Sequence, residues 1–425
     1  YDQDGDLDLY ILENQKLTNV PTNYRPKIMD GSAANNDRLF RNEGNGKFAD
    51  VTIQAGIVYE GYGLGLAVSD VNKDGWLDIY VSNDYLSNDI LYINEKNGTF
   101  KNRIAEFVGH QSQFSMGNDA ADLNNDALPD IITLDMLPES NDRKKSTIGN
   151  KNYLTYINNE KFGYQYQYVR NMFHLNNGLD KGIKFSEMGQ LSGIHQTEWS
   201  WSPLSADFDN DGHKDVLITN GFPKDITDKD FANYRADVGN IASIGLLIDS
   251  IPVIKIPNYA FRNNKDLTFS DVTKEWGMDK PSFSNGAAFG DLDNDGDLDY
   301  VVNNINSRAF VYENTLLNPE KNNAPGDNNF LKVKLNGSEY NVQAIGAKIT
   351  VYHNFGQIQY HEQSVYRGFL SSVDAIAHFG LGKSSHIDSI VVDWPDGKIS
   401  NLQDINTNQL ITVEYKTAID VKKTQ

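Results

Sequence analysis

The sequence predicts an all-β protein in which a β-propeller of repeated blades is followed by a small β-sandwich. A nine-residue acidic element recurs through residues 1–314, and each copy leads into a short apolar run. A second element, an aromatic residue followed by Asn, recurs at matching intervals. Residues 315–329 are rich in Asn and Pro and carry no repeat, and strand-like runs resume after them. We therefore expect a propeller over residues 1–314, a linker over 315–329 and a separate β domain over 330–425.

Composition and charge narrow the class of protein. The 425 residues carry 38 Lys and Arg against 58 Asp and Glu, a net charge of -20 that argues against nucleic acid or an anionic membrane as partner. The absence of Cys excludes disulfides, cysteine-ligated metal sites and a thiol nucleophile. With 39% hydrophobic residues the chain is globular. Its longest apolar stretch, residues 244–256, is broken by Asp249, Pro252 and Lys255, so we expect no membrane-spanning segment.

The acidic element reads Asp-x-Asn/Asp-x-Asp-Gly-x-x-Asp in its complete form. Copies begin at Asp70, Asp122, Asp207 and Asp291, and residues 2–8 repeat the element without its opening carboxylate. The β-branched run after each copy is typical of a buried strand. The four copies begin 52, 85 and 84 residues apart. If one blade takes the shortest spacing, the two longer intervals each carry an insertion of about 30 residues.

The second element continues through a turn that contains Gly and ends at Phe. It runs from Phe40 to Phe48, from Tyr92 to Phe100, from Phe173 to Phe185 and from Phe261 to Phe269. A strand–turn–strand unit that alternates with a loop–strand unit is typical of a propeller blade.

The tail carries its own strand pattern. Strand-like runs lie at residues 330–335, 347–352, 357–363, 389–394 and 410–415. Their alternation, together with the hairpin signal Asp396-Gly397, predicts a β-sandwich.

The acidic elements have the composition of cation-binding loops. Side-chain oxygens at positions 1, 3, 5 and 9 and the backbone carbonyl at position 7 can surround one hard cation, and Gly at position 6 permits the positive φ that folds the loop around it. Carboxylates this close repel one another without a cation, and oxygen ligands favour calcium over zinc or copper. A single copy could equally be an acidic turn that holds no ion, but five copies in register favour calcium. The predicted ligands are Asp2, Asp4, Asp6 and Asp8; Asp70, Asn72, Asp74, Trp76 and Asp78; Asp122, Asn124, Asp126, Leu128 and Asp130; Asp207, Asp209, Asp211, His213 and Asp215; and Asp291, Asp293, Asp295, Asp297 and Asp299.

Two copies depart from the pattern. Ala127 replaces the glycine, which costs on the order of 1 kcal/mol if the turn keeps a positive φ, so we predict that residues 122–130 form the weakest site or an empty one. Residues 2–8 lack the first ligand. All of these ions are expected to be structural, because none has an open coordination position beside a base. Loops of this kind fill where calcium is near millimolar, which indicates a location outside the cytoplasm.

Three other features are candidates for binding. Tyr153, Tyr156, Tyr164, Tyr166 and Tyr168 lie in the first insertion, and the last three would share one face of a strand, either as a binding platform or as core packing. The second insertion, residues 222–257, is expected to form a short helix on a propeller face and to be a working surface. Trp199 and Trp201 are expected to pack between blades, with an aromatic clamp at the central channel as the alternative.

The sequence indicates no catalytic residue and no cofactor other than calcium. The His residues are scattered, and His213 is expected to offer only its carbonyl. No Gly-x-Ser-x-Gly or P-loop pattern occurs. We therefore expect a protein that is not an enzyme.

The loops resemble the FG-GAP or VCBS repeats of integrin-α-like propellers. The tail resembles the ASPIC/UnbV domain through Arg367 to Phe369, residues 378–382 and Trp394 to Gly397. Together they resemble the cartilage-acidic-protein-like family, whose members are numerous among surface or exported proteins of Bacteroidota. The resemblance implies a seven-bladed propeller, with about two blades before Tyr1. It also implies an exported protein whose lipid anchor would lie in the preceding part, and no established enzymatic activity.

These observations together predict a calcium-stabilised binding protein, exported or displayed on the outer-membrane surface. The propeller insertions would contact a protein or a glycan, and the sandwich would cap or dock the propeller. One alternative is a structural subunit of an outer-membrane assembly, which predicts an apolar face on an insertion. The other is a lyase or hydrolase with a site at the central channel, which would need a cluster of His, Tyr or carboxylates away from the loops.

Overall fold

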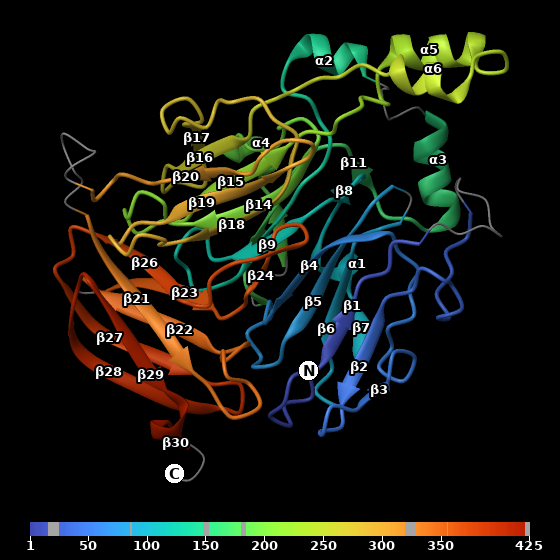
Figure 1. Ribbon diagram of the computed structural model, residues 1–425. Coiled ribbons are helices and arrows are strands. Elements are labelled where there is room, and N and C mark those ends of the chain that lie inside the picture. The colour runs from blue at the N-terminus through green and yellow to red at the C-terminus, as the bar shows by residue number, and fades with distance from the viewer. Residues whose placement is uncertain are drawn as a thin grey trace.

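The computed structural model describes residues 1–15, 25–85, 87–147, 153–179, 184–318, 328–354 and 356–420. Residues 319–327 of the expected linker and residues 421–425 of the expected sandwich lie outside this set. Within the described residues, five antiparallel sheets follow one another along the chain and a β-sandwich follows them (Figure 1). The fold is therefore all-β in its two main parts, as predicted.

The first five sheets are meanders whose strands follow in chain order, apart from short inserted elements. They comprise β1 (Leu9–Ile11), β2 (Arg38–Asn42) and β3 (Phe48–Asp50); β4 (Gly63–Ser69), β5 (Asp78–Asn83), β6 (Ile90–Asn94) and β7 (Phe100–Asn102); β9 (Asn118–Ala121), β10 (Asp130–Thr133), β12 (Met172–Asn176) and β13 (Phe185–Glu187); β14 (Ser200–Ala206), β15 (Asp215–Asn220), β16 (Tyr259–Asn263) and β17 (Phe269–Asp271); and β18 (Ser284–Gly290), β19 (Asp299–Asn304) and β20 (Phe310–Tyr312).

In all five sheets, the strand that follows the acidic element pairs with the next strand in the same register. The residue that follows each acidic element pairs with an aromatic ring of the next strand: Leu9 with Phe40, Ile79 with Tyr92, Ile131 with His174, Val216 with Phe261 and Tyr300 with Tyr312. His174 therefore holds the aromatic position of the third copy, one residue after the Phe173 suggested by the sequence. The two repeated elements thus form adjacent strands of one sheet, which explains why they recur together.

Neighbouring sheets pack face to face. Each of four hydrophobic clusters draws its side chains from two adjacent sheets, and Phe173 of β12 lies against Phe269 of β17 with ring centroids 6.3 Å apart. The strands β4, β9, β14 and β18 contact one another in that order. Close approach requires small residues there, because a Cβ on Gly117 would lie 2.2 Å from the carbonyl oxygen of Trp201. This arrangement is propeller-like, and the number of blades in a complete ring stays a prediction.

The C-terminal domain consists of two sheets around one hydrophobic core. The three-stranded sheet has the order β26-β21-β29 and the five-stranded sheet has the order β23-β22-β27-β28-β30. Their strands are β21 (Asn329–Asn336), β22 (Lys348–His353), β23 (Gln357–Glu362), β26 (Ala377–Gly382), β27 (His386–Asp393), β28 (Lys398–Asn406), β29 (Gln409–Glu414) and β30 (Ile419–Asp420), with a 3-10 turn η2 (Tyr415–Thr417). The turn from β27 to β28 contains Gly397 at φ 82°, which confirms the hairpin signal.

The insertions fold as helices. The described helices are α1 (Ile104–Phe107), α2 (Asn141–Ser146), α3 (Tyr153–Phe162), α4 (Gly189–Ser192), α5 (Lys229–Val238) and α6 (Ile244–Asp249), and β8 (Gln111–Ser112) pairs with β11 (Gln167–Tyr168). In Figure 1, α2, α5 and α6 gather at the end of the molecule away from β27 and β28. The helix expected in the second insertion is confirmed. Among the described residues, none of these helices has the length and apolar character needed to cross a membrane.

The tyrosine-rich segment corrects one expectation. Tyr153 belongs to α3, Tyr164 is buried after it, and only Tyr168 lies in a strand, the two-residue β11. The side chain of Tyr156 lies outside the described set. The expectation that Tyr164, Tyr166 and Tyr168 share one strand face is wrong, because this insertion folds outside the blade sheet.

A short hairpin of the C-terminal domain reaches the propeller axis. Its strands β24 (Tyr366–Arg367) and β25 (Ser371–Ser372) contact β4, β9, β14 and β18, the first strands of four sheets. Gly368 N donates to Asn118 O (3.1 Å), and Phe369 N donates to Ser202 Oγ (3.1 Å). The Trp201 and Phe369 rings lie 4.9 Å apart. Trp201 thus packs on this axial hairpin as well as on the cluster between the third and fourth sheets.

Candidate metal centre

All five acidic loops occupy the same place, immediately before β1, β5, β10, β15 and β19. Each loop has two residues in the left-handed region. These are Gln3, Lys73, Asn125, Asn210 and Asn294 at position 4, with φ from 55° to 63°, and Gly5, Gly75, Ala127, Gly212 and Gly296 at position 6, with φ from 65° to 104°. The positive φ at position 6 was predicted from the sequence, and the one at position 4 was not. The recurring Asn at position 4 was the available signal, since Asn tolerates this conformation better than most residues.

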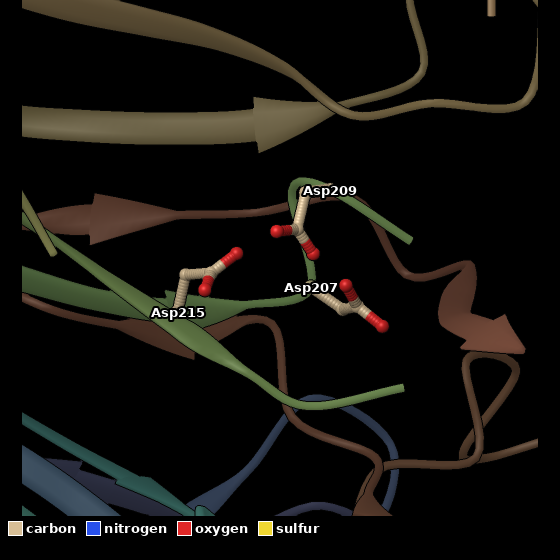
Figure 2. A group of neighbouring side chains, drawn as sticks. All are labelled: Asp207, Asp209 and Asp215. Carbon is tan, nitrogen blue, oxygen red and sulfur yellow. The ribbon is translucent and has the colours of Figure 1, made fainter. Parts of the chain in front are cut away.

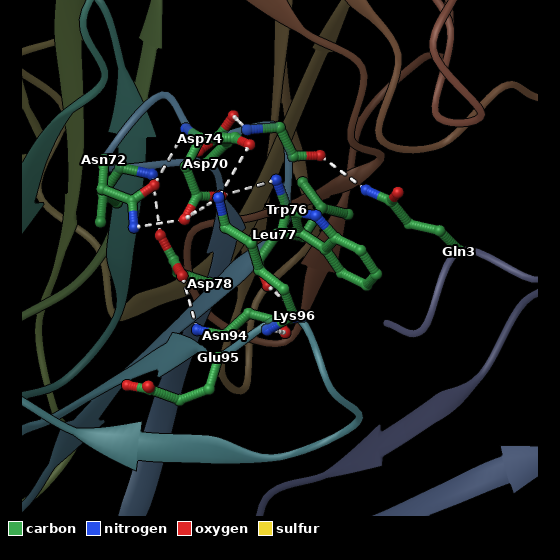
Figure 3. Close-up of polar contacts among 12 residues, drawn as sticks. Gln3, Asp70, Asn72, Asp74, Trp76, Leu77, Asp78, Asn94, Glu95 and Lys96 are labelled. Atoms are coloured by element: carbon green, nitrogen blue, oxygen red, sulfur yellow. Dashed lines mark hydrogen bonds and ion pairs between the residues drawn. The ribbon is translucent and has the colours of Figure 1, made fainter.

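In the four loops that begin with Asp, this first carboxylate accepts backbone N–H groups of its own loop. Asp70 Oδ1 accepts from Asp74 N at 2.9 Å, and Asp70 Oδ2 accepts from Gly75 N at 2.8 Å (Figure 3). Asp122 and Asp207 accept the equivalent pairs. These bonds hold the loop in a tight arc with its side-chain oxygens gathered together.

The ninth carboxylate ties the loop to the neighbouring strand. Asp78 Oδ1 accepts from Asn94 N at 2.8 Å, and Asp78 Oδ2 accepts from Val71 N at 3.2 Å. The Asn94 side chain donates to Leu77 O and also to Tyr1 O in the preceding loop (Figure 3 shows Asp78 and Asn94). The same Asp–Asn pair recurs as Asp8–Asn42, Asp130–Asn176, Asp215–Asn263 and Asp299–Asn314. Asn314 was missed in the sequence, although Tyr312 two residues earlier marks the motif.

Two loops bring three carboxylates into metal-binding proximity among the described residues. One oxygen each from Asp207, Asp209 and Asp215 lies within 4.8 Å of the others (Figure 2), and the same holds for Asp291, Asp293 and Asp295. The loops at 70–78 and 122–130 have Asn72 and Asn124 at position 3, which offer an amide oxygen instead of a carboxylate. Residues 2–8 do not bring three carboxylates equally close.

Burial disfavours the charged form of these carboxylates and so raises their pKa values. It raises the pKa of Asp78 to about 8, of Asp297 to about 7 and of Asp209 to about 6, and neighbouring carboxylates add to each shift. Burial also raises the pKa of Asp207 and Asp215 well above the ordinary range. A bound cation would remove the cost, because it neutralises the group without a proton.

The donor atoms fit a hard cation. Asp291 Oδ1, Asp295 Oδ2, Asp297 Oδ1 and Asp6 Oδ1 are buried, and none has a hydrogen-bond partner among the described residues. Buried oxygens of this kind need a partner, and an oxygen-only ligand set is what calcium prefers. The residues of these loops therefore fit calcium, with the seventh residue, such as Trp76 or His213, offering its backbone carbonyl.

Neighbouring loops are bonded to one another. The position-4 side chain of one loop donates to the position-6 carbonyl of the next, from Gln3 to Gly75 (2.7 Å), from Asn125 to Gly212 (2.8 Å) and from Asn210 to Gly296 (3.1 Å). Lys73 interrupts this series, and its Nζ lies 3.5 Å from the ring centroid of Tyr360 in the C-terminal domain. These bonds connect loop 2–8 with 70–78 and loop 122–130 with 207–215 and 291–299, so in this series the loop layer consists of two bonded groups.

The C-terminal domain sits directly on this layer. His378 Nε2 contacts Asn210 Oδ1 at 2.6 Å, and Gly382 N donates to Asn210 O at 2.8 Å. A Cβ on Gly380 would lie 2.0 Å from Asp207 Oδ2, so only glycine permits this approach. Lys348 pairs with Asp70 and Lys332 with Asp291. The sequence led us to expect that the sandwich caps or docks the propeller, but it did not indicate which residues make the contact.

Replacing Ala127 with Gly is expected to stabilise the protein. Ala127 holds φ 65°, which strains an L residue, whereas the glycines at this position adopt φ of 90° to 104°. The expected gain is about 1 kcal/mol in the free energy of unfolding, with tighter calcium binding at residues 122–130. Urea unfolding and calcium titration measure both quantities. The reverse change, Gly212→Ala, should destabilise; a loss on Ala127→Gly would show that this turn is not strained.

Comparison with known proteins gives consistent matches. Residues 337–420 match the ASPIC and UnbV family, and residues 1–81, 70–133 and 257–302 match the FG-GAP-like repeat. Cartilage acidic protein 1 of Mus musculus is 24% identical over 351 residues, which are 82% of this chain and 44% of that protein. The Homo sapiens protein is 23% identical over 369 residues, which are 86% of this chain and 46% of that protein. The chain therefore spans less than half the length of these relatives.

Two solved structures are similar at a low level. One is a lectin of Agrocybe aegerita described as recognising non-reducing terminal N-acetylglucosamine, with TM-score 0.30, 17% identity and coverage of 65% of this chain and 60% of that one. The other is the V. cholerae biofilm matrix protein Bap1, with TM-score 0.33 and 10% identity. The match covers 95% of this chain and 56% of that one. These scores are too low to support a function for this chain.

Proposed function

Because this chain carries FG-GAP-like repeats and an ASPIC and UnbV domain and is homologous to cartilage acidic protein 1, we propose that it is a calcium-stabilised extracellular binding protein without catalytic activity. Its partner is a protein, held by the second insertion. Extracellular calcium would keep the loop layer filled and the scaffold rigid.

The observation that carries this proposal is an apolar patch on the second insertion. The patch consists of Ile241, Ile244, Leu246, Ile248 and Val253, whose exposed fractions run from 49% to 85%. The helix α6 has no buried residue. Its N-terminus is capped by Ser243, whose Oγ accepts from Leu246 N, and Lys224 Nζ donates to Ile248 O at 2.9 Å. These exposed apolar side chains are thus presented on an ordered element, and exposed apolar residues gathered in one segment favour an interaction site.

The chemistry of the patch favours a protein over a glycan. Residues 240–254 contain one charged side chain, Asp249, in a chain of net charge -20. Depletion of charge is typical of the core of a protein–protein interface, whereas sugars need polar groups and aromatic platforms that the patch lacks. A stable assembly partner at the outer membrane would use the same surface and is one outcome of the test below.

The centre of the propeller-like arc supports the same proposal. The axial hairpin occupies the place where β4, β9, β14 and β18 converge, with Arg367 bonded to Asp119 and the Phe369 ring in contact with Trp201 at a tilted angle. A propeller enzyme would bind its substrate there. In this chain the hairpin of the C-terminal domain lies in that place and contacts all four strands.

A patch variant tests the proposal. The variant Ile244→Ser/Leu246→Ser should fold normally, because both side chains are exposed, and should lose a cross-linked partner that the wild type captures from native membranes. The control is Tyr340→Ser/Val342→Ser, a pair with 68% exposure at each position in the C-terminal domain. The captured protein is then purified, and its Kd should weaken at least about tenfold for the patch variant alone. An unchanged Kd, or a partner that proves to be a glycan, would contradict the assignment.

A further inference from the structure

Two lysines of the C-terminal domain contact the first carboxylate of two calcium loops. Lys348 of β22 pairs with Asp70 Oδ2, and Lys332 of β21 pairs with Asp291 Oδ2 at 2.5 Å. The lysine side chains are 14% and 11% exposed, and those of Asp70 and Asp291 are 0% and 4% exposed. Solvent therefore screens these pairs weakly.

The other loops are held differently. In loop 207–215, Gly380 lies against Asp207, and the nearby Lys265 pairs with Asp211 while 48% exposed. In loop 122–130, Lys214 Nζ donates to the backbone carbonyl of Asp122 and not to its carboxylate. Among the described residues, a buried lysine thus reaches the first carboxylate only in loops 70–78 and 291–299.

Lys332 leaves one oxygen of Asp291 without a partner in the described part of the chain, whereas at Asp70 the oxygen that Lys348 does not contact, Oδ1, accepts one hydrogen bond, from Asp74 N. Lys332 and Gly296 N both contact Asp291 Oδ2, while Asp291 Oδ1 is buried and has no hydrogen-bond partner among the described residues. Asp295 Oδ2 and Asp297 Oδ1 are likewise buried and have no hydrogen-bond partner among the described residues. The ammonium group therefore occupies one oxygen of the carboxylate, and a cation can take the other.

We propose that Lys332 and Lys348 are built-in counter-cations that keep the C-terminal domain docked on loops 291–299 and 70–78 when these loops lack calcium, and that lower the calcium affinity of both loops. In the empty loop the ammonium is the nearest positive charge to buried carboxylates, so its attraction is greatest there. In the filled loop it shares a carboxylate with a doubly charged ion, and the two cations repel each other. This inference rests on the calcium sites of the proposed function.

The proposal differs measurably from a purely structural role. A lysine that only ties two domains together would add equal stability with and without calcium, and its loss would leave calcium affinity unchanged. A counter-cation adds more stability without calcium, and its loss tightens calcium binding. The calcium-dependent increment in melting temperature separates the two cases.

The test uses the full chain with Lys332→Met and Lys348→Met, which keep the length of the side chain. Each variant should lose more melting temperature in EGTA than in calcium. One calcium site should bind at least about tenfold more tightly in calorimetric titration. A single and a double charge about 5 Å apart repel each other by this much even at the dielectric constant of water, and by more where solvent screens weakly. Lys332→Arg, which keeps the charge, should behave as the wild type.

Lys398→Met is the control, because Lys398 pairs with Asp396 in the same domain and not with the first carboxylate of an acidic loop. It should lower the melting temperature equally in both conditions. If Lys332→Met and Lys348→Met each lower the melting temperature equally in EGTA and in calcium, or if they weaken calcium binding, the counter-cation role is overturned. A wild type whose melting temperature is the same in calcium and EGTA would instead refute the calcium sites themselves.

Discussion

Adding EGTA to the purified protein will lower its melting temperature by about 5–8 °C. A cation that binds only the folded state adds about 2.7 kcal/mol per site at a hundredfold excess over its Kd. The two loops with three converging carboxylates, at 207–215 and 291–299, would together contribute about 5 kcal/mol on this basis. Removing the ion also leaves buried carboxylates such as Asp207 and Asp215 without a counter-charge.

Variants of single loops show which loops account for the calcium-dependent stability. Asp207→Asn should remove more of the calcium-dependent stability than Asp122→Asn, because Asp207 belongs to a converging set of carboxylates and residues 122–130 carry the strained Ala127. Differential scanning calorimetry with and without calcium measures the difference. An unchanged melting curve in EGTA would refute calcium binding, and equal effects of the two variants would show that Ala127 does not weaken its loop.

Replacing Arg367 with Met will destabilise the protein by about 3–5 kcal/mol, the usual cost of breaking a buried ion pair from one side. Arg367 and Asp119 have exposed fractions of 7% and 2%, and Arg367 Nη2 donates to Asp119 Oδ2 at 2.7 Å and to Ser205 O at 3.1 Å. Without the guanidinium, Asp119 keeps a buried charge whose remaining donor is Ser205 N. Urea unfolding gives the loss, and the fluorescence of Trp201 should shift because its neighbour Phe369 belongs to the same hairpin.

A double-mutant cycle separates the ion pair from simple packing. Asp119→Asn/Arg367→Met removes both charges and should be clearly more stable than the sum of the single changes implies, since neither group is then left unpaired. Additive losses would mean that the axial hairpin is held by its backbone bonds, such as Gly368 N to Asn118 O, and not by the charge pair.

Much of the fold could be predicted because the sequence motifs that specify it are local and repeated. The nine-residue loop, the strand after it and the aromatic–Asn element lie close together in the chain, and the common register of Ile79 with Tyr92 follows from that spacing. The candidate ligands could be named one by one for the same reason. The positive φ at position 6 was also foreseen, since only a turn of that hand folds the loop onto its own side chains.

The errors of the sequence analysis fall where the repeat is interrupted. Tyr164, Tyr166 and Tyr168 alternate like strand residues, but the insertion that carries them contains α3 and pairs only briefly, through β11. His174 was passed over because an imidazole was not counted as the aromatic residue of its strand. A period-two pattern over a few residues does not distinguish a strand from a short loop.

The sequence by itself therefore determined the strands of the repeated sheets, the acidic loops and the C-terminal β domain, because each depends on residues a few positions apart. The tertiary structure alone decided that this domain rests on the loops and sends a hairpin to the propeller axis. The pairs that hold it there, Lys348 with Asp70 and Arg367 with Asp119, join residues 278 and 248 positions apart. A single lysine or arginine carries no periodic signal, and its partner is fixed only when the whole chain has packed.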